Sequence, residues 1–146
     1  TGKILKKYNY NNFLINFGGQ ILICGKKNSE NWKIGIQNPF DSEKILKALT
    51  FNDNNCHALS TSGDYNRFFD KEGKKYSHII DPKTGLPVEG GHSITVIGEN
   101  STIVDILSTA VSVKNKDIDF IKETAKKFNV TIYTLTGADV ELKEYK

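Results

Sequence analysis

The sequence predicts an α+β fold: an antiparallel or mixed sheet built from hairpins, followed by two helices late in the chain. Two observations support this class. Short apolar runs bounded by Gly, Asn and Pro fill the chain up to about residue 97, whereas clear helical periodicity appears only after residue 100. Strands and helices that are segregated in this way are typical of α+β proteins. With 146 residues, 38% of them hydrophobic and 25% charged, the chain is long and apolar enough to bury a core.

The early apolar runs predict strands. The runs on either side of Gly18-Gly19 predict a hairpin, and Asn38-Pro39 ends another strand because a residue before proline is disfavoured in a helix. The strands expected before residue 61 are 12–17, 20–24, 32–36 and 56–60. Residues 44–51 fit either a short helix or a strand. The helical spacing of Ile4, Leu5 and Tyr8 suggests the last turns of a helix that begins upstream, so we expect the chain to be a fragment.

The later part predicts both helices. Strands are expected at 75–80 and 93–97, and the run Asp81-Pro82-Lys83-Thr84-Gly85 between them predicts a turn. Asn100 or Ser101 is expected to cap a helix that continues to about Val111. A second helix is expected over 116–128, followed by a strand at 130–135 and a short strand in the tail.

Charge and cysteine content limit the function classes. The net charge is +3 and the lysines are scattered, which is unlike the basic stripe of a nucleic-acid-binding protein, so we expect no nucleic-acid partner. Cys24, in the run Ile21 to Cys24, is expected to be a core residue. Cys24 and Cys56 lie far apart in the sequence and match neither a zinc motif nor a disulfide framework, so they leave the redox compartment open.

Asp105 and Thr109 are the pair of residues with the clearest chemical potential. They stand four residues apart on one face of the expected helix. Carboxylate and hydroxyl oxygens are ligands for hard cations such as Mg²⁺, which usually also binds substrate phosphates. The alternative is a solvated Asp and a Thr that bonds back to its own helix, and the spacing by itself favours this alternative.

Two further segments have polar groups at strand ends. His78 is a candidate general acid or base because its ordinary pKa lies near neutrality, although a half-buried structural histidine is the commoner case. The segment 61–65, which contains Ser62 and Gly63, follows a strand and predicts a turn that could present N–H groups to phosphate, or a plain structural turn.

Taken in order, five segments of the chain resemble the ApbE family, the FAD:protein FMN transferases. The matching segments are LINFGGQ at 14–20, WKIGIQNP at 32–39, STSGDYNRF at 60–68, YSHIIDPKTGLP at 76–87 and DILSTA at 105–110. One departure is Gln20, where the family more often has Asn or Asp, so Gln20 is not assigned to the site.

The resemblance implies a Mg²⁺-dependent enzyme with FAD as substrate. The D-x-x-x-T helix of the family matches Asp105 and Thr109, which are the expected metal ligands, and Asp105 could also share the catalytic role. The H-x-x-D-P-x-T-G segment implies that His78 is catalytic and lies at the flavin, with Ile79 in contact with FAD. Ser62 and Gly63 are expected to line the cofactor site.

The implied reaction transfers FMN from FAD to a Thr or Ser hydroxyl of an acceptor flavoprotein and releases AMP. The alternative is a non-catalytic module that binds a flavin or nucleotide, and a second alternative is a structural domain. The resemblance also implies an exported, lipid-anchored protein on the periplasmic or outer side of a bacterial inner membrane. The chain matches the C-terminal portion of the family domain, and without the N-terminal half it is expected to be inactive. The expected partner is that missing half or, in a homodimer, a second copy of the chain.

Overall fold

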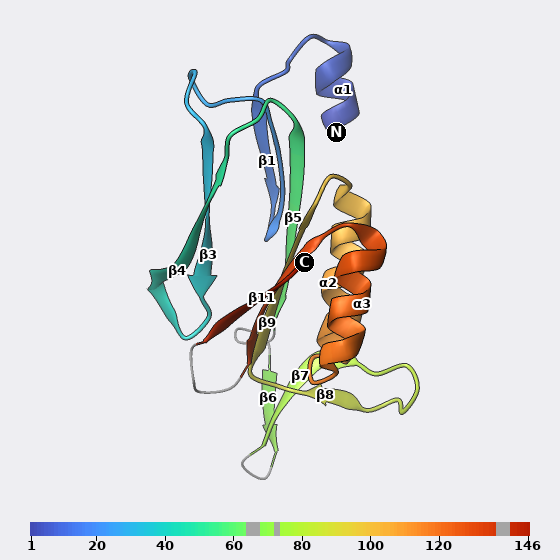
Figure 1. Ribbon diagram of the computed structural model, residues 1–146. Coiled ribbons are helices and arrows are strands. Elements are labelled where there is room, and N and C mark those ends of the chain that lie inside the picture. The colour runs from blue at the N-terminus through green and yellow to red at the C-terminus, as the bar shows by residue number, and fades with distance from the viewer. Residues whose placement is uncertain (64–67, 72–73, 137–140) are drawn as a thin grey trace.

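The computed structural model describes residues 1–63, 68–71, 74–136 and 141–146. The described residues form a six-stranded sheet, a two-stranded sheet, a three-stranded sheet and three helices (Figure 1). Strands paired as antiparallel hairpins precede the two longer helices, which confirms the predicted α+β class.

The six-stranded sheet is the frame of the molecule, with strand order β1-β2-β5-β9-β10-β11 and antiparallel pairing throughout. Its strands are β1 Phe13–Phe17, β2 Gln20–Cys24, β5 Cys56–Gly63, β9 His92–Gly98, β10 Thr131–Thr136 and β11 Leu142–Tyr145. The first hairpin forms where the sequence predicts it: Phe17 pairs with Gln20 across Gly18 and Gly19, whose φ angles are +58° and +102°. Positive φ at both turn residues explains why glycine occupies them.

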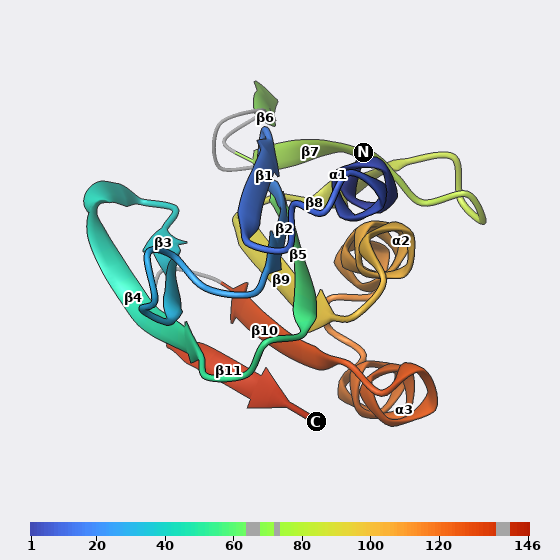
Figure 2. The ribbon, with the colours of Figure 1, turned by 90° about the horizontal axis from the view of Figure 1, so that it is seen from above.

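The helices lie on one side of this sheet (Figure 2). They are α1 Gly2–Lys7, α2 Ser101–Val113 and α3 Ile118–Phe128. The predicted cap is confirmed at Asn100, whose Oδ1 accepts hydrogen bonds from the N–H groups of Thr102 at 3.0 Å and Ile103 at 3.2 Å. Helix α3 ends at Asn129, which adopts the left-handed conformation common after a last helical turn.

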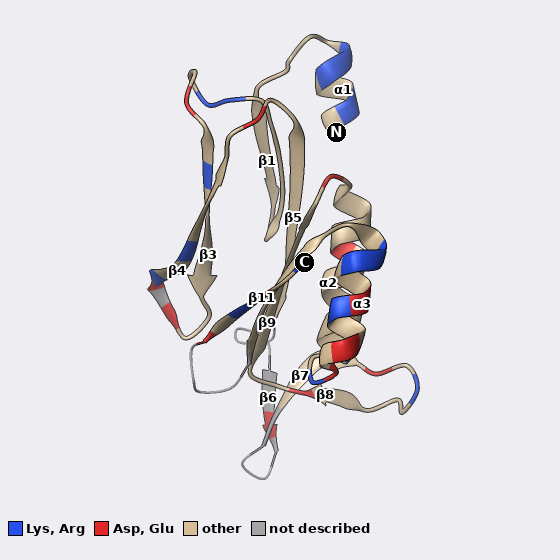
Figure 3. Ribbon diagram, viewed as in Figure 1, with Lys and Arg blue, Asp and Glu red and all other residues tan. Residues whose placement is uncertain are grey.

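The apolar core lies between the sheet and helices α2 and α3. Its members are aliphatic side chains that are almost wholly buried: Ala58, Ile94, Val96, Val104, Leu107, Val111, Ile121, Ala125, Val130 and Ile132. Strands β1, β5 and β9 of the six-stranded sheet carry no Lys, Arg, Asp or Glu, whereas α1, α3 and the β3–β4 hairpin do (Figure 3). None of the described helices is long and apolar enough to cross a membrane.

The two smaller sheets resolve one ambiguity and add two strands. The two-stranded sheet pairs β3 Trp32–Asn38 with β4 Asp41–Phe51, so the segment that fitted a helix or a strand is a strand. Its pairing with β3 outweighs the helical spacing of its apolar residues. The three-stranded sheet contains β6 Phe68–Lys71, β7 Lys74–Ile80 and β8 Pro87–Glu89. Strands β6 and β8 were not expected, because runs of four and three residues are too short to show a period.

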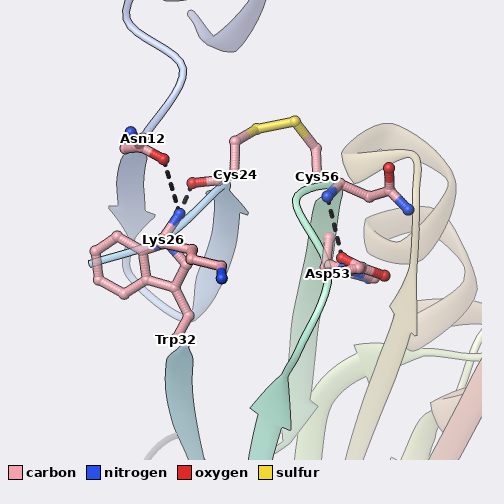
Figure 4. Close-up of a disulfide and its surroundings, with 8 residues drawn as sticks. Asn12, Cys24, Lys26, Trp32, Asp53 and Cys56 are labelled. Carbon is pink, nitrogen blue, oxygen red and sulfur yellow. Dashed lines mark hydrogen bonds and ion pairs between the residues drawn. A yellow bond between two sulfur atoms is a disulfide. The ribbon is translucent and has the colours of Figure 1, made fainter. Parts of the chain in front are cut away.

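The expectation for the cysteines was wrong in one respect: Cys24 and Cys56 form a disulfide (Figure 4). Strand β2 pairs antiparallel with β5, and the register places the two cysteines directly opposite each other. Their separation of 32 residues conceals this contact, because register becomes visible only when the strands are paired. Cys24 is 1% exposed, so the expectation that it is a core residue is confirmed.

Candidate active site

One cavity of about 1000 Å³ opens where the β1–β2 turn, β5, β7 and α2 meet. All six residues that the sequence singled out line this cavity: Ser62, Gly63, His78, Ile79, Asp105 and Thr109. They come from three elements that are well separated in the chain. The fold therefore brings the predicted residues together, although their individual roles remain predictions.

Asp105 and Thr109 lie on the exposed part of α2 that borders the cavity. The Ser60 hydroxyl donates a 3.0 Å hydrogen bond to Asp105 Oδ1, which fixes the carboxylate against β5. Thr109 Oγ1 lies 3.3 Å from Ser62 Oγ and donates a long 3.5 Å bond to the Asp105 carbonyl. The alternative to a metal role, a hydrogen bond from Thr109 back to its own helix, therefore exists, but hydrogen bonds of 3.5 Å are weak.

Three serines lie together between β5 and α2: Ser60, Ser62 and Ser108. Only Ser62 was expected at the site from the sequence. Ser108 Oγ lies 2.8 Å from Ser62 Oγ and 3.4 Å from Ser60 Oγ. Ser60 is 3% exposed and Ser108 is fully buried. The sequence does contain a signal for this group. Ser60 and Ser62 are two residues apart on a strand, and Ser108 is three residues after Asp105 on a helix, so each spacing places the two side chains on one face of its element.

The expectation of a turn at 61–65 was wrong for its first three residues. Strand β5 continues through Gly63, because Thr61, Ser62 and Gly63 stay in register with Thr95, Ile94 and Ser93 of β9. Ser62 and Gly63 thus reach the cavity from a strand end, and not from a phosphate-binding turn. Asp64 and Tyr65 lie outside the described residues.

Strand β7 supplies His78 and Ile79. The His78 side chain is exposed at the cavity, whereas Ile79 is 9% exposed and its N–H donates a 3.1 Å bond to Ser77 Oγ. The predicted turn that follows is confirmed: Gly85 N–H donates to the Asp81 carbonyl at 2.8 Å, with φ of +69° at Gly85. This turn ends the strand directly after the cavity-lining residues.

The polar side chains that line the cavity carry hydroxyl oxygens, one carboxylate at Asp105 and the imidazole nitrogens of His78. In the part of the chain that the structure describes, no group of three or more His, Cys, Asp or Glu residues could hold a metal. The pair of oxygen ligands from Asp105 and Thr109 is poorly suited to zinc, which prefers nitrogen and sulfur. It does fit Mg²⁺, which is commonly held by one or two carboxylates together with water and substrate phosphates.

Gln20 has a structural contact instead of a place in the cavity. Its Nε2 donates a 3.0 Å hydrogen bond to the Ser101 carbonyl in the first turn of α2. The first hairpin is thereby tied to the helix that carries Asp105 and Thr109.

Known proteins with the same architecture cover nearly the whole chain. The ApbE protein from Thermotoga maritima superposes with a TM-score of 0.83 and 28% identity, over 99% of this chain and 46% of its own. A histidine-to-glycine variant of the flavin transferase ApbE from Vibrio cholerae gives a TM-score of 0.76 and 27% identity, over 99% of this chain and 45% of its own.

Sequence comparison agrees with these superpositions. The FAD:protein FMN transferase of Haemophilus influenzae is 34% identical over 137 residues, and that of Escherichia coli K12 is 31% identical over 137. Both alignments cover 92% of this chain, which spans 39% and 38% of the length of these two curated relatives. The family model described as "ApbE family" matches residues 1–136. The chain therefore belongs to the ApbE family.

Proposed function

We propose that this chain supplies part of the active site of an FAD:protein FMN transferase. The observation that carries the proposal is the convergence of His78, Asp105 and Thr109 on one cavity, from a strand and a helix separated in the sequence. The names of the relatives support the same reaction class. The cavity volume of about 1000 Å³ suits a ligand as large as a dinucleotide.

The proposed reaction moves an FMN unit. A Thr or Ser hydroxyl of an acceptor flavoprotein attacks the phosphorus of the FMN half of FAD. The bond from this phosphorus to the bridging oxygen breaks, the bridging oxygen leaves with AMP, and the acceptor keeps FMN as a phosphoester.

His78 is the proposed general base that takes the proton of the attacking hydroxyl, a contribution of roughly 10²–10⁴ in rate. His78 is an exposed residue that lines the cavity, where the acceptor hydroxyl would enter. Asp105 can share this role only in part, because its Oδ1 already accepts a hydrogen bond from Ser60. Ser62, Gly63 and Ile79 would line the flavin side of the cavity.

Asp105 and Thr109 are the proposed Mg²⁺ ligands. When bound, Mg²⁺ would supply positive charge that stabilises the diphosphate oxygens as negative charge develops on them. The protein's own contribution is to hold the carboxylate and the hydroxyl one helical turn apart at the cavity. Only one carboxylate is offered, which leaves positions for phosphate oxygens and water.

We propose that a further segment completes this site, as the N-terminal half of the family domain. The chain spans about two fifths of the relatives' length, as the 39% and 38% coverage shows. Large apolar residues that line the cavity are exposed, among them Ile106 at 58% and Ile80 at 49%. Apolar surface of this kind is usually covered by a neighbour. A second copy of the chain is the alternative occupant, and the mass of the full-length protein in solution separates the two.

We propose that the protein works outside the bacterial cytoplasm, as an exported protein anchored at the inner membrane. The Cys24–Cys56 disulfide supports this location, because disulfides persist in oxidising compartments and are rare in reducing ones. Alkylation of protein taken directly from cells, followed by mass spectrometry, tests it. Fully alkylated cysteines in the native protein would contradict export.

Flavinylation of an acceptor tests the function directly. The full-length protein is incubated with FAD, Mg²⁺ and a candidate acceptor flavoprotein, and covalent flavin fluorescence and AMP are measured. Asp105→Ala is expected to lower the rate by at least about 100-fold, in line with the loss of a main electrostatic contributor. FAD binding without AMP release by the wild-type protein, with every acceptor tried, would favour the non-catalytic binding module. Full turnover by Asp105→Ala would contradict the metal assignment.

A further inference from the structure

The interface between β5 and α2 changes along its length: apolar side chains fill its far part, and hydroxyl groups line the part next to the cavity. Alternate side chains of β5 face α2, so Ala58 belongs to the apolar core while Ser60 and Ser62 face the polar part of the helix. Ser60 and Ser108 are at most 3% exposed. Buried hydroxyl groups of this kind need hydrogen-bond partners, so the partners of these serines determine how this part of the interface is arranged.

The connections run from Asp105 to Thr109 through three serines, which we call the hydroxyl chain: Ser60, Ser62 and Ser108. Ser60 Oγ lies 3.0 Å from Asp105 Oδ1 and 3.4 Å from Ser108 Oγ. Ser62 Oγ lies 2.8 Å from Ser108 Oγ and 3.3 Å from Thr109 Oγ1. The two proposed metal ligands are therefore linked by a continuous series of side-chain oxygen contacts, each 3.4 Å or shorter, as well as by their helix.

Each hydroxyl has one proton, so the hydroxyl chain has a direction. The ionised carboxylate of Asp105 only accepts, so Ser60 donates to it. We assign the Ser108 proton to the Asp105 carbonyl at 2.9 Å, the common back-bond of a serine inside a helix, and this proton then points away from Ser62. With this assignment Ser62 donates to Ser108, so the Thr109 proton goes either to Ser62 Oγ at 3.3 Å or to the Asp105 carbonyl at 3.5 Å.

This direction determines what the cavity receives. Thr109 donates its proton into the protein, so the remaining lone pairs of its oxygen are available at the cavity. Asp105 Oδ1 is held by Ser60, so Oδ2 is the carboxylate oxygen left for another partner. Oxygen lone pairs without a competing proton are what a hard divalent cation requires.

We propose that Ser60, Ser62 and Ser108 are positioning residues that orient the lone pairs of Asp105 and Thr109 toward a divalent cation in the cavity. The proposal rests on the metal role given to Asp105 and Thr109 under the proposed function. It adds that two buried serines, Ser60 and Ser108, control metal affinity from behind the ligands. Hydrogen-bonded groups behind metal ligands typically change metal affinity or activity by about 10- to 100-fold when removed.

Helix α2 offers a matched control at Ser112. This serine is also fully buried, and its hydroxyl donates a 2.9 Å bond to the Ser108 carbonyl. That bond serves only the helix backbone and has no link to the Asp105 carboxylate in the described contacts. Ser112→Ala and Ser108→Ala therefore remove the same group from the same helix, but only Ser108→Ala interrupts the hydroxyl chain.

The test measures Mn²⁺ affinity of the full-length protein by the EPR signal of free Mn²⁺, with FAD present. FAD affinity is measured separately in EDTA, and the melting temperature of each variant is recorded. Ser60→Ala and Ser108→Ala are expected to weaken Mn²⁺ binding by about 10- to 100-fold. Ser112→Ala is expected to bind Mn²⁺ like the wild type, and all three variants are expected to keep the metal-free FAD affinity.

The outcomes separate this proposal from the proposed function. Unchanged Mn²⁺ affinity in Ser60→Ala, beside its loss in Asp105→Ala, would overturn the positioning role and leave the metal site intact. Unchanged affinity in Asp105→Ala would remove the metal role itself, and the positioning role with it. Equal weakening of Mn²⁺ and metal-free FAD binding in Ser60→Ala would indicate general damage to the cavity and also overturn the proposal.

Discussion

The two sides of helix α2 differ in what they contribute to the molecule. One side buries Val104, Leu107 and Val111 in the apolar core, and the other presents Asp105 and Ser108 to the serines of β5. Truncating a buried Leu costs about 2–5 kcal/mol of folding free energy, whereas one hydrogen bond contributes about 1 kcal/mol net. Within this one helix, different residues therefore determine the stability of the fold and the geometry of the site.

The largest effect on stability is expected at Leu107, next to Ser108 in the sequence. Leu107→Ala should lower the free energy of unfolding by about 2–5 kcal/mol, because it leaves a cavity in the core. Urea denaturation of the full-length protein measures the loss. The folded fraction should keep its Mn²⁺ affinity. If Leu107→Ala weakened Mn²⁺ binding as strongly as Ser108→Ala does, the division between the two sides of α2 would be wrong.

Strand β5, which faces α2, has the same division between residues that stabilise the fold and residues that line the cavity. Cys24 and Cys56 join β2 to β5 at the start of β5 (Figure 4). Ser62 and Gly63 lie at the other end of β5. Replacing both cysteines with alanine should lower the free energy of unfolding by about 2–4 kcal/mol. Denaturation of the variant is compared with the wild type with and without reductant. A stable variant with lost Mn²⁺ affinity would show instead that the disulfide sets the geometry of the cavity.

The smallest effect is expected at an ion-pair cluster on the far edge of the sheet. Glu144 accepts from Lys146 Nζ at 2.6 Å and from Lys47 Nζ at 2.8 Å, and these bonds lower its pKa from 4.5 to about 2. A carboxyl whose folded-state pKa is lowered stabilises the fold above its unfolded pKa, and this stabilisation is lost as the pH falls toward the folded value.

Glu144→Gln should therefore cost less than about 1 kcal/mol at pH 7, because the ion pairs are only partly shielded from solvent. The difference from the wild type should shrink below pH 4.5 and vanish near pH 2, as followed by denaturation at each pH. A difference that stayed constant from pH 7 to pH 2 would show that the carboxylate charge is not its source.

Local sequence features predicted most of the main sheet and both longer helices. The Gly18-Gly19 hairpin and the Asn100 cap depend on neighbouring residues, so their signals are local. The pairing of Cys24 with Cys56 depends on which strands become neighbours, and no local signal contains that information. The extension of β5 through Gly63 likewise depends on its ladder with β9, which overrides the turn preference of Ser and Gly.

The sequence predicted which residues line the site, but it did not predict the hydrogen bonds that connect them. Family motifs identified His78, Asp105 and Thr109, and the fold brings these residues to one cavity. The roles of Ser60 and Ser108 require the distance between β5 and α2, which a strand period and a helix period cannot supply separately.

The central claim is that Asp105 and Thr109 hold a divalent cation at the flavin. Crystals of the full-length protein grown with Mn²⁺ and FAD, measured at the manganese absorption edge, test it most directly. We expect one anomalous peak about 2 Å from an Asp105 carboxylate oxygen and from Thr109 Oγ1, beside the diphosphate. An anomalous peak elsewhere, with both side chains turned away from it, would show that Asp105 and Thr109 are not the metal ligands.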